Sequence, residues 1–532
     1  MNPYTTTAFT RMQAQTATVT SGPMAHPALP AAEQQRYLAL IQQGLPRPTT
    51  PQRVIVIGAG MAGLTAAYEL LRAGHNPILL EAAERVGGRC HTLRAPFVDG
   101  QSGEAGAMRF PAAHKLLFAY LYKFNLPLRK FAGYDPDGFF HLQGQKQKMG
   151  AVLTDPDSPQ SRMIMRWNQT VDPILAFYYS EQAKGNNVWP QLVAHYQDLS
   201  LHDFLVLHDW SEAEIAMLGT IGLGRGGYGA LMHIAFLELF RLTLTGSGDQ
   251  GEYQIVGGND QLPQRLLHEP ANAAGDTLAN RIIYGATVTA IEQSRHKITV
   301  HYQTAVGPWS VQGDYAITTI PLPAFRSITV TPALSSGKQR VLQEMNYVKS
   351  AKIFLQCKSR FWENAPAGEE TTGLTITDLP IRNLFFPGPD EQQAKPVILA
   401  SYTWNDDAAF WGALSPTERI QQAVAMIAQI YPAITEEVEV GASWVWDESQ
   451  PFGGCGFSLC TPGQLHFYEE LTKPEGLLYF AGEHASYEHG WVEGAIESGL
   501  RTALAIHQAG AAKVTTHQHA FPMRVAQRLA AA

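Results

Sequence analysis

The first strong hydrophobic pattern in the chain is a pair of continuous apolar runs, at residues 54–57 and 77–80. Short runs without polar alternation are typical of strands that are buried on both faces of a parallel sheet. Residues 61–73, between the two runs, place apolar side chains at helical spacing. We therefore predict a strand–helix–strand unit, since parallel strands need a crossover connection of about this length.

The pattern changes several times outside this unit. A short helix is expected over residues 31–45, and residues 150–245 have mainly helical spacing and many aromatic residues. Residues 351–442 are mixed, and a last helix is expected from about residue 491. Short strand-like runs complete the pattern, at residues 282–283, 288–291, 297–300, 315–320 and 476–480.

Composition and charge narrow the possible partners. The chain has 45% hydrophobic and 16% charged residues, which is typical of globular proteins. Its net charge of -8, without a dense Lys/Arg block, disfavours a nucleic-acid partner, because phosphate binding requires clustered positive charge. The most apolar stretch, residues 229–244, contains His233, Glu238 and Arg241, so no membrane span is predicted.

The cysteines and the N-terminal residues indicate where in the cell the protein is expected. Four cysteines are too few and too scattered for a disulfide framework, and no pair has zinc-site spacing, so no metal site is predicted. The first fifty residues lack a basic stretch followed by an apolar core, so no secretory signal is predicted. We expect a cytoplasmic protein, and secretion stays open as the alternative.

A glycine-rich turn lies exactly between the first predicted strand and its helix. Gly58 suits the tight turn, Gly60 lets the backbone approach a pyrophosphate, and Gly63 permits close helix–strand packing. The helix that begins at Met61 and Ala62 directs free N–H groups and a positive dipole end toward the phosphates. Glu81 ends the second strand, about twenty residues later, where a carboxylate accepts ribose hydroxyls. These features predict a dinucleotide site.

A second diglycine follows the acidic strand end at once, in Glu84-Arg85-Val86-Gly87-Gly88-Arg89. It gives another close backbone approach to a phosphate, with guanidinium charge beside it. This arrangement resembles the flavin amine oxidase family, and the resemblance continues from about residue 53 to residue 508. It implies an FAD cofactor.

The segment Gly103-Glu104-Ala105-Gly106-Ala107-Met108-Arg109-Phe110-Pro111 resembles the motif of the amino-acid oxidases within that family. The resemblance implies that Arg109 binds the substrate carboxylate, for which a planar guanidinium is well suited. The segment around Tyr402, Ser401-Tyr402-Thr403-Trp404-Asn405, resembles the one that supplies a second carboxylate ligand. A surface arginine and a core tyrosine are the alternatives that the residues alone leave open.

Ser350-Ala351-Lys352-Ile353-Phe354-Leu355, followed by Phe361-Trp362-Glu363, also resembles the L-amino acid oxidases. In that family the lysine at the position of Lys352 holds a water against flavin N5. A buried cation at this place favours the negative charge that develops when oxygen reacts with reduced flavin. A lysine that faces solvent at a strand start is the alternative.

The C-terminal block carries the most specific resemblance, in Phe480-Ala481-Gly482-Glu483-His484 and Gly490-Trp491-Val492-Glu493-Gly494. It implies that Glu483 contacts the ribose–phosphate region, and that Gly490 and Trp491 line the substrate amine and the flavin face. The helix that starts here would direct its positive end at the flavin, where it stabilises the anionic reduced form. Trp444 matches a family tryptophan beside the isoalloxazine, with a core tryptophan as the alternative.

Cys455 falls where monoamine oxidases attach flavin covalently. Amino-acid oxidases generally lack that bond, so we expect non-covalent FAD and a small core residue at Cys455. The cofactor-binding residues expected from the glycine turns and from the resemblance are Gly58, Gly60, Met61, Ala62, Gly63, Glu81, Ala82, Arg85, Gly88, Arg89, Gly106, Ala107, Met108, Arg109, Val288, Trp444, Gly482, Glu483, Gly490, Trp491 and Val492.

A chain of 532 residues is too long for one hydrophobic core. We predict an α/β fold with a discontinuous Rossmann-like FAD-binding domain, a mixed-sheet (α+β) substrate domain and an inserted helical domain. The predicted segments are an N-terminal arm and helix at 1–50, the FAD-binding domain at 51–92, 255–345 and 441–510, the substrate domain at 93–150, 246–254 and 346–440, the helical domain at 151–245 and an alanine-rich tail at 511–532.

The predicted function is oxidation of an L-amino acid by FAD and oxygen, which gives a 2-oxo acid, ammonia and hydrogen peroxide. The catalytic residues expected are Arg109, Lys352, Tyr402, Gly490 and Trp491. Three alternatives stay open: an amino-acid 2-monooxygenase that releases an amide, a monoamine or polyamine oxidase, and a catalytically silent flavoprotein. We expect the small-molecule amino acid and oxygen as partners of a homo-oligomer, a dimer.

Overall fold

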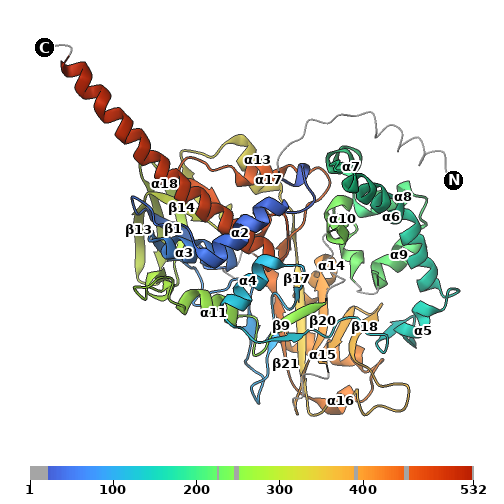
Figure 1. Ribbon diagram of the computed structural model, residues 1–532. Coiled ribbons are helices and arrows are strands. Elements are labelled where there is room, and N and C mark those ends of the chain that lie inside the picture. The colour runs from blue at the N-terminus through green and yellow to red at the C-terminus, as the bar shows by residue number, and fades with distance from the viewer. Residues whose placement is uncertain (1–21, 224–226, 245–250, 389–393, 449–453, 530–532) are drawn as a thin grey trace.

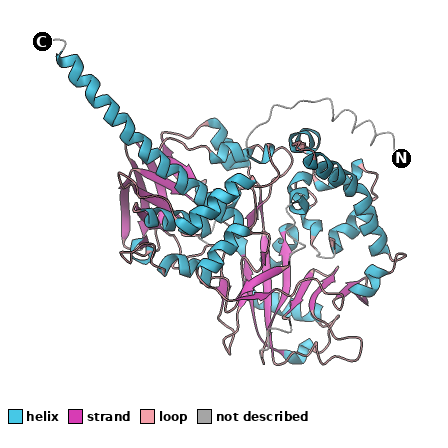
Figure 2. Cartoon of the chain, in the orientation of Figure 1, coloured by secondary structure: helices cyan, strands magenta, loops and turns pink. Residues whose placement is uncertain are grey.

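The computed structural model describes residues 22–223, 227–244, 251–388, 394–448 and 454–529. Its elements form three regions (Figures 1 and 2): a sheet with the long C-terminal helix, a second large sheet, and a group of helices without strands. The α/β fold class predicted from the sequence is confirmed, with extra helices and a mixed second sheet. Residues 1–21, which include most of the expected N-terminal arm, lie outside the described residues.

A five-stranded parallel sheet forms the first region, in the order β10-β2-β1-β14-β23. The predicted strand–helix–strand unit is present as β1, α3 and β2, and both of its strands are almost wholly buried. The bounds are β1 Arg53–Ile57, α3 Met61–Ala73, β2 Asn76–Leu80, β10 Ile282–Ile283, β14 Tyr315–Thr318 and β23 Leu478–Phe480. The sheet thus joins segments that are more than 400 residues apart in sequence.

The long helix α18 (Val492–Leu529) packs against α3. A Cβ at Gly499 would lie 2.6 Å from the Ala62 carbonyl oxygen, so only glycine allows this close crossing. The expected alanine-rich tail continues this helix as far as Leu529. A four-stranded sheet lies beside β1, with β11 Thr287–Gln293, β12 Ile298–Thr304, β13 Gly307–Gly313 and β15 Thr329–Thr331 in the order β13-β12-β11-β15.

The second region is a seven-stranded mixed sheet in the order β21-β17-β20-β19-β18-β7-β8. Strand β17, next to the edge strand β21, is buried along its whole length. Lys352 on β17 lies opposite Tyr402 on β20 and Trp444 on β21, so these three residues are cross-strand neighbours. The bounds are β7 Phe139–Leu142, β8 Gln145–Lys148, β17 Ser350–Cys357, β18 Gly373–Thr377, β19 Asn383–Phe386, β20 Val397–Trp404 and β21 Val438–Val445.

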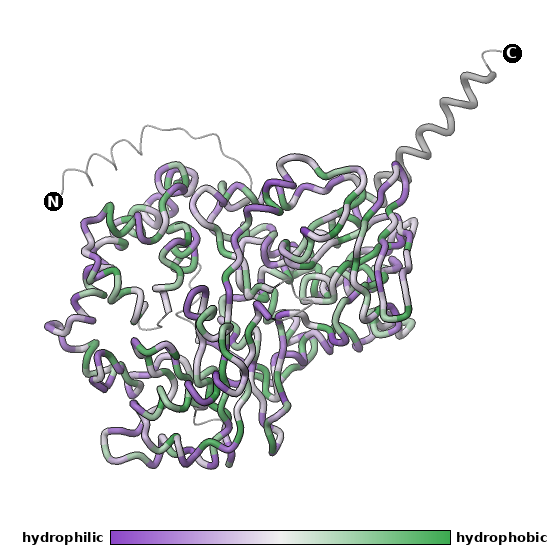
Figure 3. Tube along the Cα trace, turned by 180° about the vertical axis from the view of Figure 1, so that it is seen from behind, coloured by the Kyte–Doolittle hydropathy of each residue, from purple (hydrophilic) through white to green (hydrophobic). Residues whose placement is uncertain are grey.

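The third region is helical, as the spacing of residues 150–245 predicts. Its helices are α5 Met149–Thr154, α6 Pro159–Ala183, α7 Trp189–Tyr196, α8 Leu201–Leu207, α9 Glu212–Ile221 and α10 Phe236–Leu244. Hydrophobic and hydrophilic segments alternate along them (Figure 3), as expected for helices that bury one face. Within the described residues, no helix is long and apolar enough to cross a membrane.

The remaining elements include three short sheets, β5-β9-β6, β3-β4 and β16-β22. Their bounds, with those of the other elements, are η1 Gly22–Met24, α2 Ala31–Gln43, β3 Thr92–Leu93, β4 Gly103–Glu104, β5 Phe110–Pro111, α4 Lys115–Lys123, β6 Leu128–Lys130, η2 Tyr228–Leu231, β9 Glu252–Ile255, α11 Gln261–His268, η3 Leu278–Arg281, α12 Leu322–Phe325, α13 Ser336–Glu344, β16 Tyr347–Val348, α14 Asn405–Gly412, α15 Pro416–Ile427, α16 Ile434–Glu437, η4 Trp446–Glu448, β22 Phe457–Ser458, α17 Phe467–Thr472 and η5 Glu483–Ala485.

Candidate active site

A cavity of about 650 Å³ begins at the carboxyl ends of the parallel strands and extends to the large mixed sheet. Ligands of open α/β sheets bind at that edge of the strands. The residues predicted from the sequence that line the cavity are Gly58, Gly60, Met61, Ala62, Glu81, Ala82, Gly88, Arg89, Gly106, Ala107, Met108, Arg109, Val288, Lys352, Tyr402, Gly482, Glu483, Gly490, Trp491 and Val492. Gly63, Arg85 and Trp444 are not part of this lining.

The glycine turn after β1 is shaped for a close backbone approach. Gly58 has a φ of 97°, a conformation that favours glycine. A Cβ at Gly60 would have no protein atom within 4 Å, so this glycine faces open space in the cavity. A Cβ at Gly63 would lie 2.0 Å from the Gly58 carbonyl oxygen, so Gly63 packs the turn from behind. The two glycines therefore have different roles, one toward a ligand and one toward the fold.

Glu81 both faces the cavity and fixes the turns around it. Its carboxylate accepts hydrogen bonds from the backbone N–H groups of Ala59 at 2.6 Å and Ala83 at 2.9 Å. Burial raises the pKa of the Glu81 carboxyl, and these hydrogen bonds oppose that effect. A carboxylate held in this way at the end of β2 is placed to accept hydroxyl groups of a nucleotide ribose.

The diglycine turn is held by the arginines on either side of it. Gly87 and Gly88 have φ values of 94° and 55°. Arg85 donates from Nη1 to the Gly88 carbonyl oxygen at 2.8 Å, so it supports the turn although it does not line the cavity. Arg89 donates to the Gly456 carbonyl oxygen at 3.1 Å and to Glu483 at 2.7 Å.

Glu483 connects three segments at the far end of the cavity. Besides Arg89, it accepts hydrogen bonds from the Ser458 hydroxyl at 2.6 Å and from the Gly490 N–H at 2.9 Å. Burial alone would raise the pKa of Glu483, but Arg89, His484 and the hydrogen bonds hold it at about 2. The Glu483 carboxylate therefore stays ionised and fixes the loop that leads into α18.

Arg109 lines the cavity and is anchored on one side. Its Nε lies 3.0 Å from Glu252 Oε1 on β9, an ion pair without the alignment of a hydrogen bond. The guanidinium packs over the Phe131 ring, 5.6 Å from its centroid. In the part of the chain that the structure describes, neither Nη atom has a hydrogen-bond partner. The free edge of this guanidinium can bind a carboxylate from two nitrogens.

Lys352 lies against the same cavity and is buried, with 2% of its surface exposed. Its Nζ donates to the carbonyl oxygens of Glu104 at 2.9 Å and Gly106 at 2.6 Å. Burial lowers the pKa of Lys352 to about 7, against the opposing charge of Glu104. Tyr402, its cross-strand neighbour, has its ring 4.6 Å from Nζ. The lysine is therefore poised to change its charge near neutral pH.

Aromatic side chains enclose the end of the cavity beyond Tyr402. The rings of Tyr402 and Trp404 lie 5.0 Å apart, and those of Trp404 and Phe457 lie 6.2 Å apart. A Cβ at Gly490 would lie 3.1 Å from the Phe457 ring, so the glycine leaves room at this wall. Trp491 completes the wall and packs edge-on against His114 at 5.0 Å. These residues form what we call the aromatic compartment: Tyr402, Trp404, Phe457 and Trp491.

Trp444 is the tryptophan that the sequence predicts beside the flavin, and the structure places it and Trp446 differently with respect to the cavity. Trp444 packs against His91 at 4.7 Å and Trp446 at 5.6 Å, outside the cavity lining. Trp446 lines the cavity instead and donates from Nε1 to the Ala105 carbonyl oxygen at 3.0 Å. The two tryptophans are separated by one residue, so the sequence pattern alone did not distinguish them.

Several other lining residues were missed from the sequence. The helical region contributes an apolar wall of Tyr228, Leu231, Leu239 and Leu242, for which the only signal was the aromatic and apolar richness of that stretch. His489 lines the cavity next to Gly490, and the second block of the sequence motif begins one residue later, at Gly490. Thr319, Pro321, Pro323 and Ala324 after β14 also line it, and nothing in their sequence marks them.

Comparisons with known proteins identify the family. The model of the family described as flavin containing amine oxidoreductase matches residues 61–507. The chain belongs to this family. The family implies FAD, and the structure offers a fitting cradle: open space beside Gly60, the Glu81 carboxylate, and the first turns of α3 and α18 at the same cavity.

Individual relatives carry more specific names. The chain is 35% identical over 487 residues to a putative L-amino-acid oxidase, YobN, of Bacillus subtilis (strain 168), over 88% of this chain and 97% of the relative. It is 29% identical to the L-amino acid oxidase Bs29 of Bothriechis schlegelii, over 89% and 94% of the two chains.

Solved structures show the same fold at lower identity. Wild-type putrescine oxidase bound to putrescine superposes with a TM-score of 0.69 at 19% identity, over 86% of this chain and 99% of the other. Cyclohexylamine oxidase from Brevibacterium oxydans IH-35A also gives a TM-score of 0.69, at 18% identity and with the same coverage. At this identity the likeness is one of fold.

Proposed function

We propose that the protein oxidises the α-amino group of L-amino acids with FAD, and releases a 2-oxo acid, ammonia and hydrogen peroxide. The observation that carries the proposal is Arg109, which lines the cavity and has both Nη atoms free of partners among the described residues. An oxidase of simple amines has no substrate carboxylate for such a group. The names of the relatives support the same substrate class.

In the proposed complex, the substrate carboxylate binds the free edge of Arg109 and the Tyr402 hydroxyl. Glu252 and Phe131 keep the guanidinium in place, so its geometry is preorganised before the substrate arrives. The aromatic compartment excludes water and receives the remainder of the amino acid. The apolar wall from the helical region, with Leu239 and Leu242, faces the same space.

FAD, when bound, would supply the redox chemistry, which is a two-electron oxidation of the substrate at Cα and return of the two electrons to oxygen as hydrogen peroxide. The chain contributes the positive N-terminal end of α18, with Val492 in the cavity lining, beside the region expected for the flavin ring. Lys352 contributes a cation that stabilises negative charge during the reaction with oxygen.

We further propose that the FAD is held without a covalent bond. Gly454 and Gly456 line the cavity, but Cys455 between them does not, and its side chain is buried. Burial raises the pKa of the Cys455 thiol to about 12, so at neutral pH it is a weak nucleophile. All four cysteines lie within the described residues and are buried outside any disulfide.

The test is anaerobic mixing of the purified yellow protein with single L-amino acids, followed by air. The expected result is flavin bleaching by L- but not D-amino acids or plain amines, with equal amounts of peroxide and 2-oxo acid on reoxidation. An amide product without matching peroxide would assign a 2-monooxygenase instead. Bleaching by putrescine or another amine alone would contradict the amino-acid proposal, and no bleaching by any of them would indicate a silent flavoprotein.

A homodimer and a cytoplasmic location stay predictions. Light scattering coupled to gel filtration would decide between one chain of 58.4 kDa and a pair. A mass at the single-chain value would contradict the dimer.

A further inference from the structure

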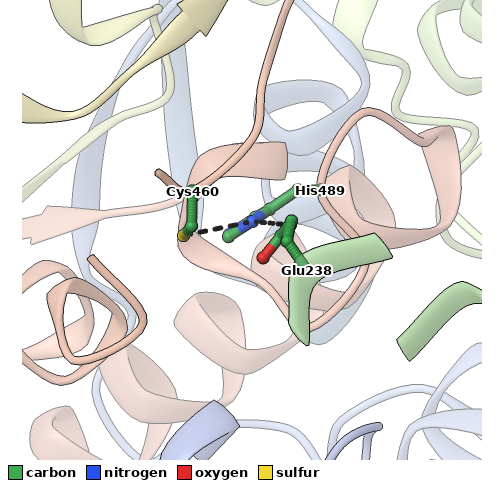
Figure 4. A group of neighbouring side chains, drawn as sticks. All are labelled: Glu238, Cys460 and His489. Atoms are coloured by element: carbon green, nitrogen blue, oxygen red, sulfur yellow. Dashed lines mark hydrogen bonds and ion pairs between the residues drawn. The ribbon is translucent and has the colours of Figure 1, made fainter. Parts of the chain in front are cut away.

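Three buried polar side chains form a cluster at the cavity (Figure 4), where His489 belongs to the lining. Its members are Glu238 on α10, Cys460, and His489 just before α18, with exposed fractions of 3%, 2% and 5%. His489 Nδ1 lies 2.7 Å from Glu238 Oε1 and 3.8 Å from Cys460 Sγ. None of the sequence motifs assigns a role to any of them. A buried polar cluster at a cavity is a candidate for binding a ligand or a metal, or for taking part in a reaction.

A metal ion fits this cluster poorly, although the three side chains could offer ligand atoms within 4.8 Å of one another. The Arg241 guanidinium lies 2.8 Å from Glu238 Oε2, with 4% of its side chain exposed, and already neutralises the carboxylate. Burial raises the pKa of the Cys460 thiol well above its ordinary value, so it is not a thiolate. A cation would have to displace a buried guanidinium and take a proton from a thiol.

The hydrogen bonds orient the His489 ring. Because Glu238 is a carboxylate acceptor, the neutral imidazole carries its proton on Nδ1 and its lone pair on Nε2. Nε2 is buried and has no hydrogen-bond partner among the described residues. His489 itself lines the cavity, and the adjacent Gly490 borders the aromatic compartment at Phe457. His489 thus borders the space proposed for the substrate and carries a buried, unpaired basic nitrogen.

We propose that His489 accepts the proton of the substrate ammonium at Nε2, with Glu238 and Arg241 as positioning residues. The inference rests on the proposed function. The N–H bond of the ammonium breaks, its electron pair stays on nitrogen, and the proton forms a bond to Nε2. The amine becomes neutral, so its lone pair can assist departure of the Cα hydride with both electrons of the C–H bond. The imidazolium is stabilised by the Glu238 carboxylate.

The charges around His489 are consistent with this role. Glu238 and Arg241 face it from α10, and Cys460 faces it from the segment after β22. His484 and Glu488 lie on its own loop. Burial lowers the pKa of His484 to about 3 and raises that of Glu488 to about 7. The Glu238–Arg241 pair has no net charge before the reaction, so a proton on Nε2 adds one positive charge to the cluster.

The test compares anaerobic flavin reduction by one L-amino acid in wild type, His489→Asn and Cys460→Ser, from about pH 6 to about pH 10. We expect His489→Asn to lower the reduction rate about 100-fold at pH 7, with the deficit shrinking toward alkaline pH. At high pH the free amine is already neutral and needs no base. Cys460→Ser is the matched control, with a rate within about threefold of wild type, because its sulfur contact is weak.

Glu238→Gln supplies a second variant. Without the Glu238 carboxylate, the protonated imidazole ring of His489 is less stable. We therefore expect the acidic limb of the pH profile to move to lower pH. FAD content and thermal melting separate this effect from misfolding. Equal pH profiles for wild type and a folded His489→Asn would overturn the inference, as would stoichiometric metal in the purified protein. If wild type is reduced by an amine but by no amino acid, the proposed function fails alone, and the same pH series with that amine decides the role of His489.

Discussion

Arg109 and Glu252 form an ion pair across the edge of the candidate active site, with 3.0 Å between Nε and Oε1. The two residues are far apart in sequence and meet because β5, which follows Arg109, pairs with β9. The pair engages Nε of the guanidinium, and among the described residues neither Nη atom of Arg109 has a hydrogen-bond partner. In the proposed reaction, Glu252 therefore fixes the group that binds the substrate carboxylate.

Replacement of Arg109 by Met should remove the carboxylate site. We expect kcat/KM for L-amino acids to fall at least about 100-fold, because hydrogen bonds to a charged group contribute about 1.5–3 kcal/mol each. Glu252→Ala should raise KM about fivefold through loss of the anchor, and Glu252→Gln, which keeps the shape, should lie between that variant and wild type. Steady-state kinetics with peroxide detection measures all three. An Arg109→Met enzyme with wild-type KM would contradict the proposed binding mode.

Gly60 and Gly63 should respond to alanine in opposite ways. A Cβ at Gly60 meets no protein atom within 4 Å, so Gly60→Ala should fold with the melting temperature of wild-type apoprotein. It should bind FAD much more weakly, because the methyl group occupies the space for the pyrophosphate. At Gly63 a Cβ would lie 2.0 Å from the Gly58 carbonyl oxygen, so Gly63→Ala should lower the stability of the apoprotein itself. Fluorescence titration with FAD and melting of the apoproteins distinguish the two. Normal FAD affinity in Gly60→Ala would contradict the assigned site.

Lys352 should control the reaction with oxygen. Replacement by Met removes the cation, and we expect the reoxidation rate of reduced flavin to fall about 100-fold, while anaerobic reduction falls far less. Burial holds the pKa of Lys352 at about 7, so the wild-type reoxidation rate should decrease as pH rises through 7 and the lysine loses its charge. Stopped-flow mixing of reduced enzyme with oxygen gives this rate. A reoxidation rate independent of both pH and Lys352 would refute the role.

Glu497 on α18 should make the protein less stable at alkaline pH. Burial raises the pKa of its carboxyl from 4.5 to about 8, and Glu497 accepts one hydrogen bond, from the Tyr487 N–H at 2.9 Å. Between these pH values the folded state keeps a proton that the unfolded state releases, so stability falls as pH rises from 4.5 to 8. Glu497→Gln, which imitates the protonated form, should be about 2 kcal/mol more stable than wild type at pH 8.

The same variant should match wild type at pH 5, where Glu497 is protonated in the folded state. The control is Glu344→Gln, at a half-exposed surface pair with Arg340, which should change stability by less than about 0.5 kcal/mol at either pH. Denaturant unfolding of the holoprotein at the two pH values provides the comparison. An equal stability difference at pH 5 and pH 8 would contradict titration of Glu497.

The sequence by itself determined the local units and the family. The run from Val54 to Ile57, the glycine turn and helix 61–73 are each specified by neighbouring residues, and the structure has this helix with the predicted bounds. Short-range patterns of this kind depend on hydrophobic period and backbone freedom, which are properties of adjacent positions. The membership of the flavin amine oxidase family, inferred from such motifs, is confirmed by the family match.

The tertiary structure decided which side chains meet. Trp446, not Trp444, lines the cavity, because the fold anchors Trp446 on Ala105, a residue more than 300 positions away. The contacts of Glu252 with Arg109 and of Glu238 with His489 likewise join segments that are far apart in the sequence. No local sequence pattern predicts such contacts. Burial also set the charge of the site: the pKa values of about 7 for Lys352 and about 2 for Glu483 result from desolvation and from partners that only folding brings near.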